Sequence, residues 1–194
     1  MQKPPLILAS ASPRRLSLLK DIGITPEKVL PAEIDEKQKR DELPKHMTSR
    51  LALDKLKTVA SQLKNPALIL AADTVVACGR RVLPKARTDE EVRNCLKLLS
   101  GRRHHVYTSI AVQMAPDGKV MQKTCDSVVS VKRMTDKEIE SYIKSGEGIG
   151  KAGGYAIQGK AATFISAIRG SYSNIVGLPL FETARLLEQH GYFE

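Results

Sequence analysis

Short apolar runs alternate with amphipathic segments along this chain. The runs "PLILA" at 5–9 and "ALILAADTVVAC" at 67–78 predict buried strands, and apolar residues at helical spacing predict a helix over 47–63. Two longer segments, 105–114 and 120–134, flank a Pro-Asp-Gly turn and predict a hairpin. Strands interleaved with helices in this way predict an α/β domain with a mixed sheet.

Capping residues mark where the other helices begin. Ser12, followed by Pro13, predicts a helix that ends near Gly23. A strand at 163–168 and a helix after Pro179 are predicted in the last third of the chain. Threonine and glutamate three residues apart predict capping boxes at the start of two further helices: Thr88 with Glu91, and Thr135 with Glu138.

The composition indicates one globular domain with a basic surface. The chain has 42% apolar residues and no repeat or flexible linker, so we expect residues 1–194 to form a single domain. The formal net charge of +10 favours anionic partners: nucleic acid, anionic lipid or a polyanionic small molecule. Aromatic residues make up only 4% and are scattered, which argues against a base-stacking surface, so we expect no nucleic-acid partner.

The cysteines and the apolar runs predict the compartment. Cys78, Cys95 and Cys125 lie far apart, with no Cys-x-x-Cys pair and no histidine at metal-ligand spacing, which indicates a reducing cytoplasm and no structural zinc. The apolar run at 6–9 is too short for a signal peptide, and no run approaches the roughly 18 residues of a membrane span. We therefore expect a cytoplasmic protein without a membrane partner.

Two charged residues lie in apolar surroundings. Asp73 interrupts the predicted strand at 67–78, where an ionised carboxylate loses its hydration. It either caps a turn at the strand end or is held at a cleft as a general base or metal ligand. Lys55 shares the apolar face of the predicted helix with Leu51 and Val59, so it either extends its ammonium to solvent or presents a fixed charge to a phosphate.

The first predicted helix begins with Arg14 and Arg15, although a helix dipole disfavours cations in its first turn. The two guanidiniums, the hydroxyls of Ser10 and Ser12 and the free N–H groups of the helix start suit a phosphate; the alternative is two arginines that face solvent beside an ordinary cap. Gln158, within "YAIQGKA", suits either the edge of a nucleotide base or a buried structural role. The P-loop and Rossmann glycine patterns are absent from the sequence.

Several motifs occur in a fixed order: "LASASPRR" at 8–15, "RLALDK" at 50–55, "AADT" at 71–74, "LPK" at 83–85, "LSGRRH" at 99–104, "KAGGYAIQG" at 151–159 and "GSYSNIVGLPL" at 170–180. Together they resemble the Maf family of nucleoside triphosphate pyrophosphatases, nearly end to end. The resemblance implies an elongated mixed β-sheet with flanking helices, in two lobes around a cleft, similar to the inosine triphosphate pyrophosphatases. It also implies hydrolysis between the α and β phosphates, and a homodimer.

The resemblance assigns roles residue by residue. Asp73 matches the family's proton acceptor, and Lys55 and Lys85 match its phosphate-facing lysines. The proline beside Lys85 stands before the lysine rather than after it, so it restricts Leu83 instead. The N-terminal substrate loop of the family matches four residues here: Ser10, Ser12, Arg14 and Arg15.

Three positions indicate the substrate branch. Branches that act on 7-methylguanosine triphosphate have Trp, Gln and Glu where this chain has Arg14, Thr74 and Gln158, which is the pattern of the branch that cleaves dTTP, UTP and some modified pyrimidine nucleotides. The alternatives are a pyrophosphatase for methylated or other noncanonical nucleotides and a non-catalytic regulator of cell division. We expect Mg²⁺ or Mn²⁺ to bridge phosphate oxygens. Asp35 and Glu36 match an acidic pair of the family, without an assigned role.

Overall fold

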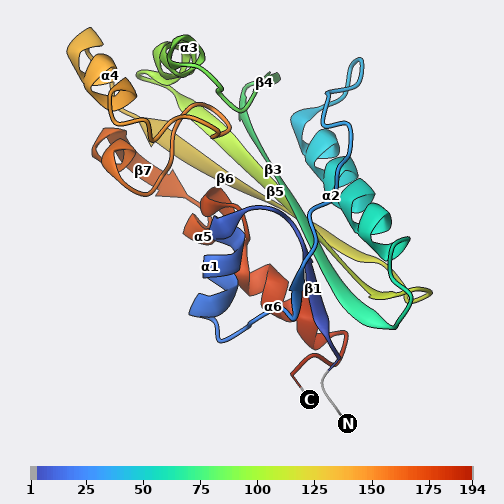
Figure 1. Ribbon diagram of the computed structural model, residues 1–194. Coiled ribbons are helices and arrows are strands. Elements are labelled where there is room, and N and C mark those ends of the chain that lie inside the picture. Colours follow the sequence, from blue (N-terminus) through green and yellow to red (C-terminus); the bar gives the residue numbers. More distant parts are fainter. Residues whose placement is uncertain (1–3, 194) are drawn as a thin grey trace.

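One mixed sheet runs through the molecule, as the computed structural model of residues 4–193 shows (Figure 1). The strand order is β2-β1-β3-β5-β6-β7, and β4 also pairs with β3. β1 is parallel to β2 and β3, while the pairs of β3 with β4, β3 with β5, β5 with β6 and β6 with β7 are antiparallel. The strands are β1 (Leu6–Ala9), β2 (Lys28–Val29), β3 (Ala67–Cys78), β4 (Arg81–Leu83), β5 (Arg103–Ala115), β6 (Met121–Val131) and β7 (Ile165–Arg169).

Helices cover both faces of this sheet. Side chains of a strand point alternately to opposite faces, so Ile69 and Ala71 of β3 pack with one helix, α2, while Leu68, Leu70 and Ala72 pack in a larger core with the other helices. β3 is therefore buried on both faces, which explains its nearly continuous apolar sequence. The helices are α1 (Pro13–Asp21), α2 (Pro44–Ala60), α3 (Asp89–Leu99), α4 (Asp136–Ile143), α5 (Tyr172–Val176) and α6 (Leu180–Glu188), with a 3₁₀ helix at Lys160–Phe164.

The predicted α/β architecture is confirmed. Figure 1 shows the long strands β3, β5 and β6 running along an elongated molecule, with α3 and α4 near one end and α6 near the other. The helix predicted over 47–63 begins earlier, because Pro44 takes a first-turn position that needs no N–H donor, and it ends at Ala60. The first two residues of the strand predicted at 163–168 belong to a 3₁₀ helix, and the strand itself runs from Ile165 to Arg169.

The capping predictions hold in different degrees. Thr135 and Glu138 form the full reciprocal box. Thr88 accepts from the Glu91 N–H, but the Glu91 carboxylate accepts from the Arg87 N–H instead of closing the box.

Cys78, Cys95 and Cys125 form no disulfide. Within residues 4–193 no helix is both long enough and apolar enough to cross a membrane.

Candidate active site

A cleft of about 430 Å³ opens where one edge of β3 is left uncovered. On that edge, β1 pairs with β3 only as far as Ala71, and β4 begins to pair at Val76. The opposite edge is paired with β5 throughout this stretch. The gap between β1 and β4 therefore exposes the edge of residues 72–75, and side chains from both faces of the sheet reach the same cleft.

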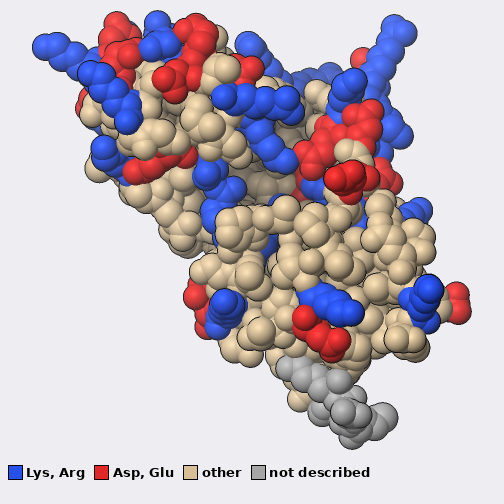
Figure 2. Space-filling view, viewed as in Figure 1, with Lys and Arg blue, Asp and Glu red and all other residues tan. Residues whose placement is uncertain are grey.

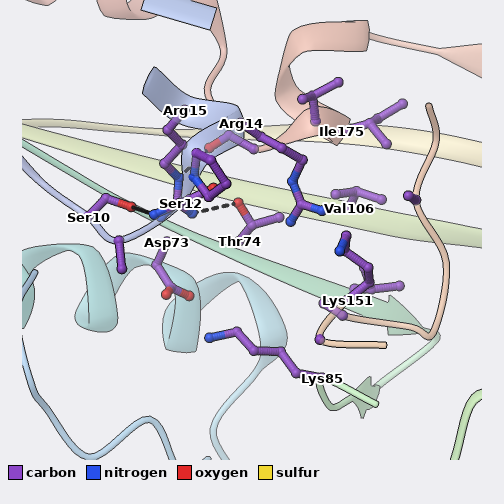
Figure 3. A pocket seen from close by; sticks show the side chains of 18 of the residues that line it. Ser10, Ser12, Arg14, Arg15, Asp73, Thr74, Lys85, Val106, Lys151 and Ile175 are labelled. Carbon is purple, nitrogen blue, oxygen red and sulfur yellow. Dashed lines mark hydrogen bonds between the residues drawn. The ribbon is translucent and has the colours of Figure 1, made fainter. Parts of the chain in front are cut away.

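The structure brings all the candidate site residues into this cleft. Figure 3 shows Asp73, Thr74, Lys85 and the residues of the N-terminal loop around it. They come from the loop after β1, from α1, α2 and β3, and from two irregular segments near residues 85 and 158. Figure 2 shows lysine and arginine side chains beside a hollow in this face of the molecule, and acidic side chains gathered next to it. The candidates that line the cleft are Ser10, Ser12, Arg14, Arg15, Lys55, Asp73, Thr74, Lys85 and Gln158.

Asp73 faces α2 because it shares the face of Ile69 and Ala71 along β3. Its carboxylate accepts a hydrogen bond from Lys55 Nζ on α2, at 2.6 Å. Lys55 Nζ also lies 2.6 Å from Glu36 Oε1, and Glu36 Oε2 lies 2.7 Å from Lys85 Nζ. Carboxylates and ammonium groups thus alternate along one wall of the cleft.

Burial and charge act in opposite directions on these carboxylates. Burial raises the pKa of Asp73, and the positive charges of Lys55 and Arg15 only partly oppose it. Partial burial also acts to raise the pKa of Glu36, but the hydrogen bonds and charges of Lys55 and Lys85 outweigh it and lower that pKa to about 2. Glu36 is therefore ionised at neutral pH, whereas Asp73 is the carboxylate that is disposed to take a proton.

Arg15 holds the N-terminal loop in place. Its buried guanidinium donates to Ser10 Oγ at 2.9 Å, to Thr74 Oγ1 at 3.1 Å and to the Gly177 carbonyl at 2.8 Å. Ser12 occupies the N-cap position of α1 as predicted, but its hydroxyl makes no capping hydrogen bond. The loop is thus fixed by Arg15, and the Ser12 hydroxyl is not used by the helix.

Arg14 presents an unused donor to the cleft. Its Nε is buried and has no hydrogen-bond partner among residues 4–193. Lys151, which also lines the cleft, has its pKa lowered by burial and by the positive charge of Arg14. Two cations that repel each other beside an unpaired donor suit an anionic ligand.

The position of Lys85 is fixed by backbone hydrogen bonds despite the altered proline position. Ala86 N–H donates to the Lys151 carbonyl, and Gly150 and Gly153 N–H groups donate to the Ala86 and Pro84 carbonyls. These bonds join the Lys85 loop to the segment that carries Lys151, so both lysines face one space.

Two charged residues that line the cleft, Glu36 and Lys151, lie outside the predicted set. Glu36 belongs to a long irregular segment between β2 and α2, where no hydrophobic periodicity marks a direction; the acidic pair that it forms with Asp35 was its only signal. Asp35 instead accepts from the Lys37 N–H and does not line the cleft. Lys151 opens the glycine-rich motif "KAGGYAIQG", which was noted in the sequence without a role for the lysine.

The fold and the site define a class: an α/β protein whose basic cleft, built around a buried carboxylate, suits a polyanionic ligand. A family model described as "Maf-like protein" matches residues 5–190, and the chain belongs to the Maf family.

Similar proteins agree with this assignment. A Caulobacter vibrioides protein named "dTTP/UTP pyrophosphatase" is 52% identical over 97% of both chains. A Rickettsia akari protein named "Nucleoside triphosphate pyrophosphatase" is 51% identical over 97% of this chain and 94% of that protein. A solved HAM1 protein from Coxiella burnetii covers 96% of this chain and 99% of its own, with a TM-score of 0.51 and 16% identity, which is a likeness of fold.

Proposed function

We propose that this protein hydrolyses dTTP and UTP to the monophosphate and pyrophosphate. The observation that carries the proposal is the buried Asp73 carboxylate, paired with Lys55 in a cleft that also holds Lys85, Lys151 and Arg14. The name of the Caulobacter relative supports the choice of pyrimidine triphosphates.

Asp73 is the proposed general base. A water molecule beside it transfers a proton to the carboxylate as the water oxygen bonds to one phosphorus of the α–β anhydride. The bond from that phosphorus to the bridging oxygen breaks, and the monophosphate and pyrophosphate separate. Burial raises the pKa of Asp73, which makes the carboxylate a stronger base than one in water.

Lys55, Lys85 and the arginine loop stabilise the charge of the phosphates in this proposal. In the structure, the Glu36 carboxylate pairs with the ammonium groups of both lysines. The oxygens of a bound phosphate offer these ammonium groups the same kind of acceptor. Arg14 Nε, which is without a partner in residues 4–193, supplies a further donor, while Arg15 keeps Ser10 and the loop in position.

A divalent cation, Mg²⁺ or Mn²⁺, belongs to the proposal. Among residues 4–193 no group of three or more histidine, cysteine or acidic side chains is placed to hold a metal ion. Asp73 and Glu36 both lie 2.6 Å from Lys55 Nζ, so two carboxylates are close together, and Mg²⁺ is commonly held by one or two carboxylates and the substrate phosphates. The residues therefore fit a cation that binds with the triphosphate, where it would neutralise phosphate charge.

Gln158 is the proposed reader of the base. Its side chain is exposed in the cleft and has no hydrogen-bond partner among residues 4–193, so its amide can offer a donor and an acceptor to a pyrimidine edge. Thr74, which is hydrogen-bonded to Arg15 and Thr108, also lines the cleft.

We further propose a homodimer that works in the cytoplasm. The family resemblance implies the dimer, and the unpaired cysteines suit a reducing compartment. Phe181 on α6 is 69% exposed, which is unusual for a large apolar side chain and suits an interface. Light scattering of the protein and of its Phe181→Asp variant tests this: a monomer in both would contradict the dimer.

The test of the activity is pyrophosphate release from a panel of nucleoside triphosphates with Mg²⁺ or Mn²⁺. We expect turnover of dTTP and UTP that Asp73→Asn abolishes while nucleotide binding persists. A near-native rate in the variant would exclude Asp73 as the base. No release from any nucleotide would contradict the proposed activity and favour the regulator.

A further inference from the structure

The segment that carries Gln158 has no regular secondary structure. Residues 155–159 lie between β6 and β7 in sequence and belong to neither strand nor helix. Gln158 itself makes no side-chain hydrogen bond within residues 4–193, so the backbone of the segment sets its position. What holds this backbone therefore decides where the amide points.

Three side chains from outside the segment hold it. His104 Nε2 on β5 lies 2.7 Å from the Tyr155 hydroxyl, and the imidazole packs edge-on against the Tyr155 ring. The Tyr142 hydroxyl on α4 accepts from the Ala156 N–H at 3.1 Å.

Glu147 supplies the third contact, on the other side of Gln158. Its carboxylate accepts from the Lys160 N–H at 2.9 Å. A Cβ on Gly159 would lie 2.6 Å from Glu147 Oε2, and the φ of Gly159 is +89°, so the close approach of the carboxylate depends on this glycine.

The side chains that make the first two contacts are buried, and their charges do not change near neutral pH. His104 is fully buried, and Tyr142 is 1% exposed. Burial lowers the pKa of His104 to about 4 and raises that of Tyr155, so a neutral imidazole meets a protonated phenol. His104 and Tyr155 thus form a hydrogen bond between two buried polar groups. If these positions served only core packing, two apolar side chains of the same shape could replace them.

We infer that His104, Tyr142 and Glu147 are positioning residues for base selection: they hold the 155–159 segment so that Gln158 meets the pyrimidine edge. The inference rests on the proposed function, in which Gln158 reads the base. None of the three lines the cleft, so each acts on the substrate only through the segment. A loosened segment must be ordered on binding, which weakens the Michaelis complex of the preferred nucleotide more than that of a poor one.

The test is kcat/KM for UTP and for ATP in Glu147→Ala and Tyr142→Phe, each made alone and in a Gln158→Ala background. We expect each single variant to lower the UTP-to-ATP ratio about fivefold, mainly through a higher KM for UTP, which corresponds to roughly 1 kcal/mol. In the Gln158→Ala background the same changes should leave the ratio as it is. Glu147→Gln, which keeps an acceptor for the Lys160 N–H, should restore most of the loss.

Tyr107→Phe is the matched control. Tyr107 lies on the same strand as His104, stacks on His105 and does not line the cleft, so its hydroxyl should not affect the ratio. If Gln158→Ala lowers the ratio but Glu147→Ala and Tyr142→Phe do not, the inference is wrong and base reading by Gln158 stands. If Gln158→Ala leaves the ratio unchanged, base reading by Gln158 fails, and the inference fails with it.

Discussion

Lys55→Met removes the ammonium group that separates two carboxylates while it keeps a long, unbranched side chain. Lys55 Nζ lies 2.6 Å from Asp73 Oδ1 and 2.6 Å from Glu36 Oε1, and the lysine side chain is only 9% exposed. Arg15 is the remaining cation that acts on Asp73, but its three hydrogen bonds go to other groups. The variant therefore leaves the buried Asp73 without a direct partner.

The size of the effect follows from the general energetics of buried ion pairs. At an effective dielectric constant near 20, unit charges separated by 4 Å interact with about 4 kcal/mol. Removal of one member of a buried ion pair typically costs about 3–5 kcal/mol, because the other charge stays buried. We therefore expect the free energy of unfolding to fall by about 3–5 kcal/mol at pH 8.

The loss should depend on pH in a defined direction. Burial already raises the pKa of Asp73 in the folded state, and removal of Lys55 raises it further. A carboxyl whose pKa in the folded state exceeds its unfolded value of about 4 costs no stability at a pH below about 4, because the carboxyl is then protonated in both the folded and the unfolded state. The cost grows as the pH rises above the unfolded pKa and becomes constant above the folded pKa. The deficit should be small near pH 4.5 and full at pH 8.

Urea unfolding at several pH values measures this deficit. The double variant Lys55→Met/Asp73→Asn, which has no ionised carboxylate at position 73, should recover most of the stability at pH 8. Lys57→Met, an exposed lysine on the same helix, should change stability by less than about 0.5 kcal/mol. An equal deficit at pH 5 and pH 8, or a double variant as unstable as Lys55→Met, would refute a buried charge as the cause.

Three further predictions concern other parts of the fold. Because burial lowers the pKa of His104 from 6.5 to about 4, the protein should lose stability as the pH falls from 6.5 towards 4, by up to roughly 3 kcal/mol, and His104→Gln should flatten this dependence in thermal unfolding. Glu42→Ala removes the carboxylate that Arg50 binds at 2.7 and 2.8 Å. The loss of this contact frees the segment that carries Glu36, so KM for UTP should rise several-fold while Tm changes less. Gly154→Ala should lower the free energy of unfolding by about 2 kcal/mol in urea titrations, because φ is +67° and a Cβ would lie 3.0 Å from Cys95.

The sequence predicted the parts of the fold that carry a strong periodic signal. β3 was visible because burial on both faces demands a continuous apolar run, and Asp73 stood out because it interrupts that run. β2, β4 and α5 were not predicted: with two, three and five residues, they are too short to show a period.

The site was only partly predictable for a related reason. Lys55 and Asp73 are placed by a helix face and a strand face, both of which the sequence pattern defines. Two of the three partners of Arg15, Thr74 and Gly177, lie 59 and 162 residues away, and no local pattern pairs positions so far apart. Glu36 and Lys151 sit on irregular segments whose direction is set by the fold alone.

The uncovered edge of β3 explains why consecutive residues take part in one site. In a fully paired strand, neighbours such as Asp73 and Thr74 serve opposite faces and cannot meet a common ligand. Here β1 stops at Ala71 and β4 starts at Val76, so Asp73 reaches the cleft beside α2 while Thr74 reaches it beside Arg15. A buried carboxylate on one face and an arginine-held loop on the other therefore line the same cleft. The length of that gap thus decides which residues of β3 reach the cleft from both faces of the sheet.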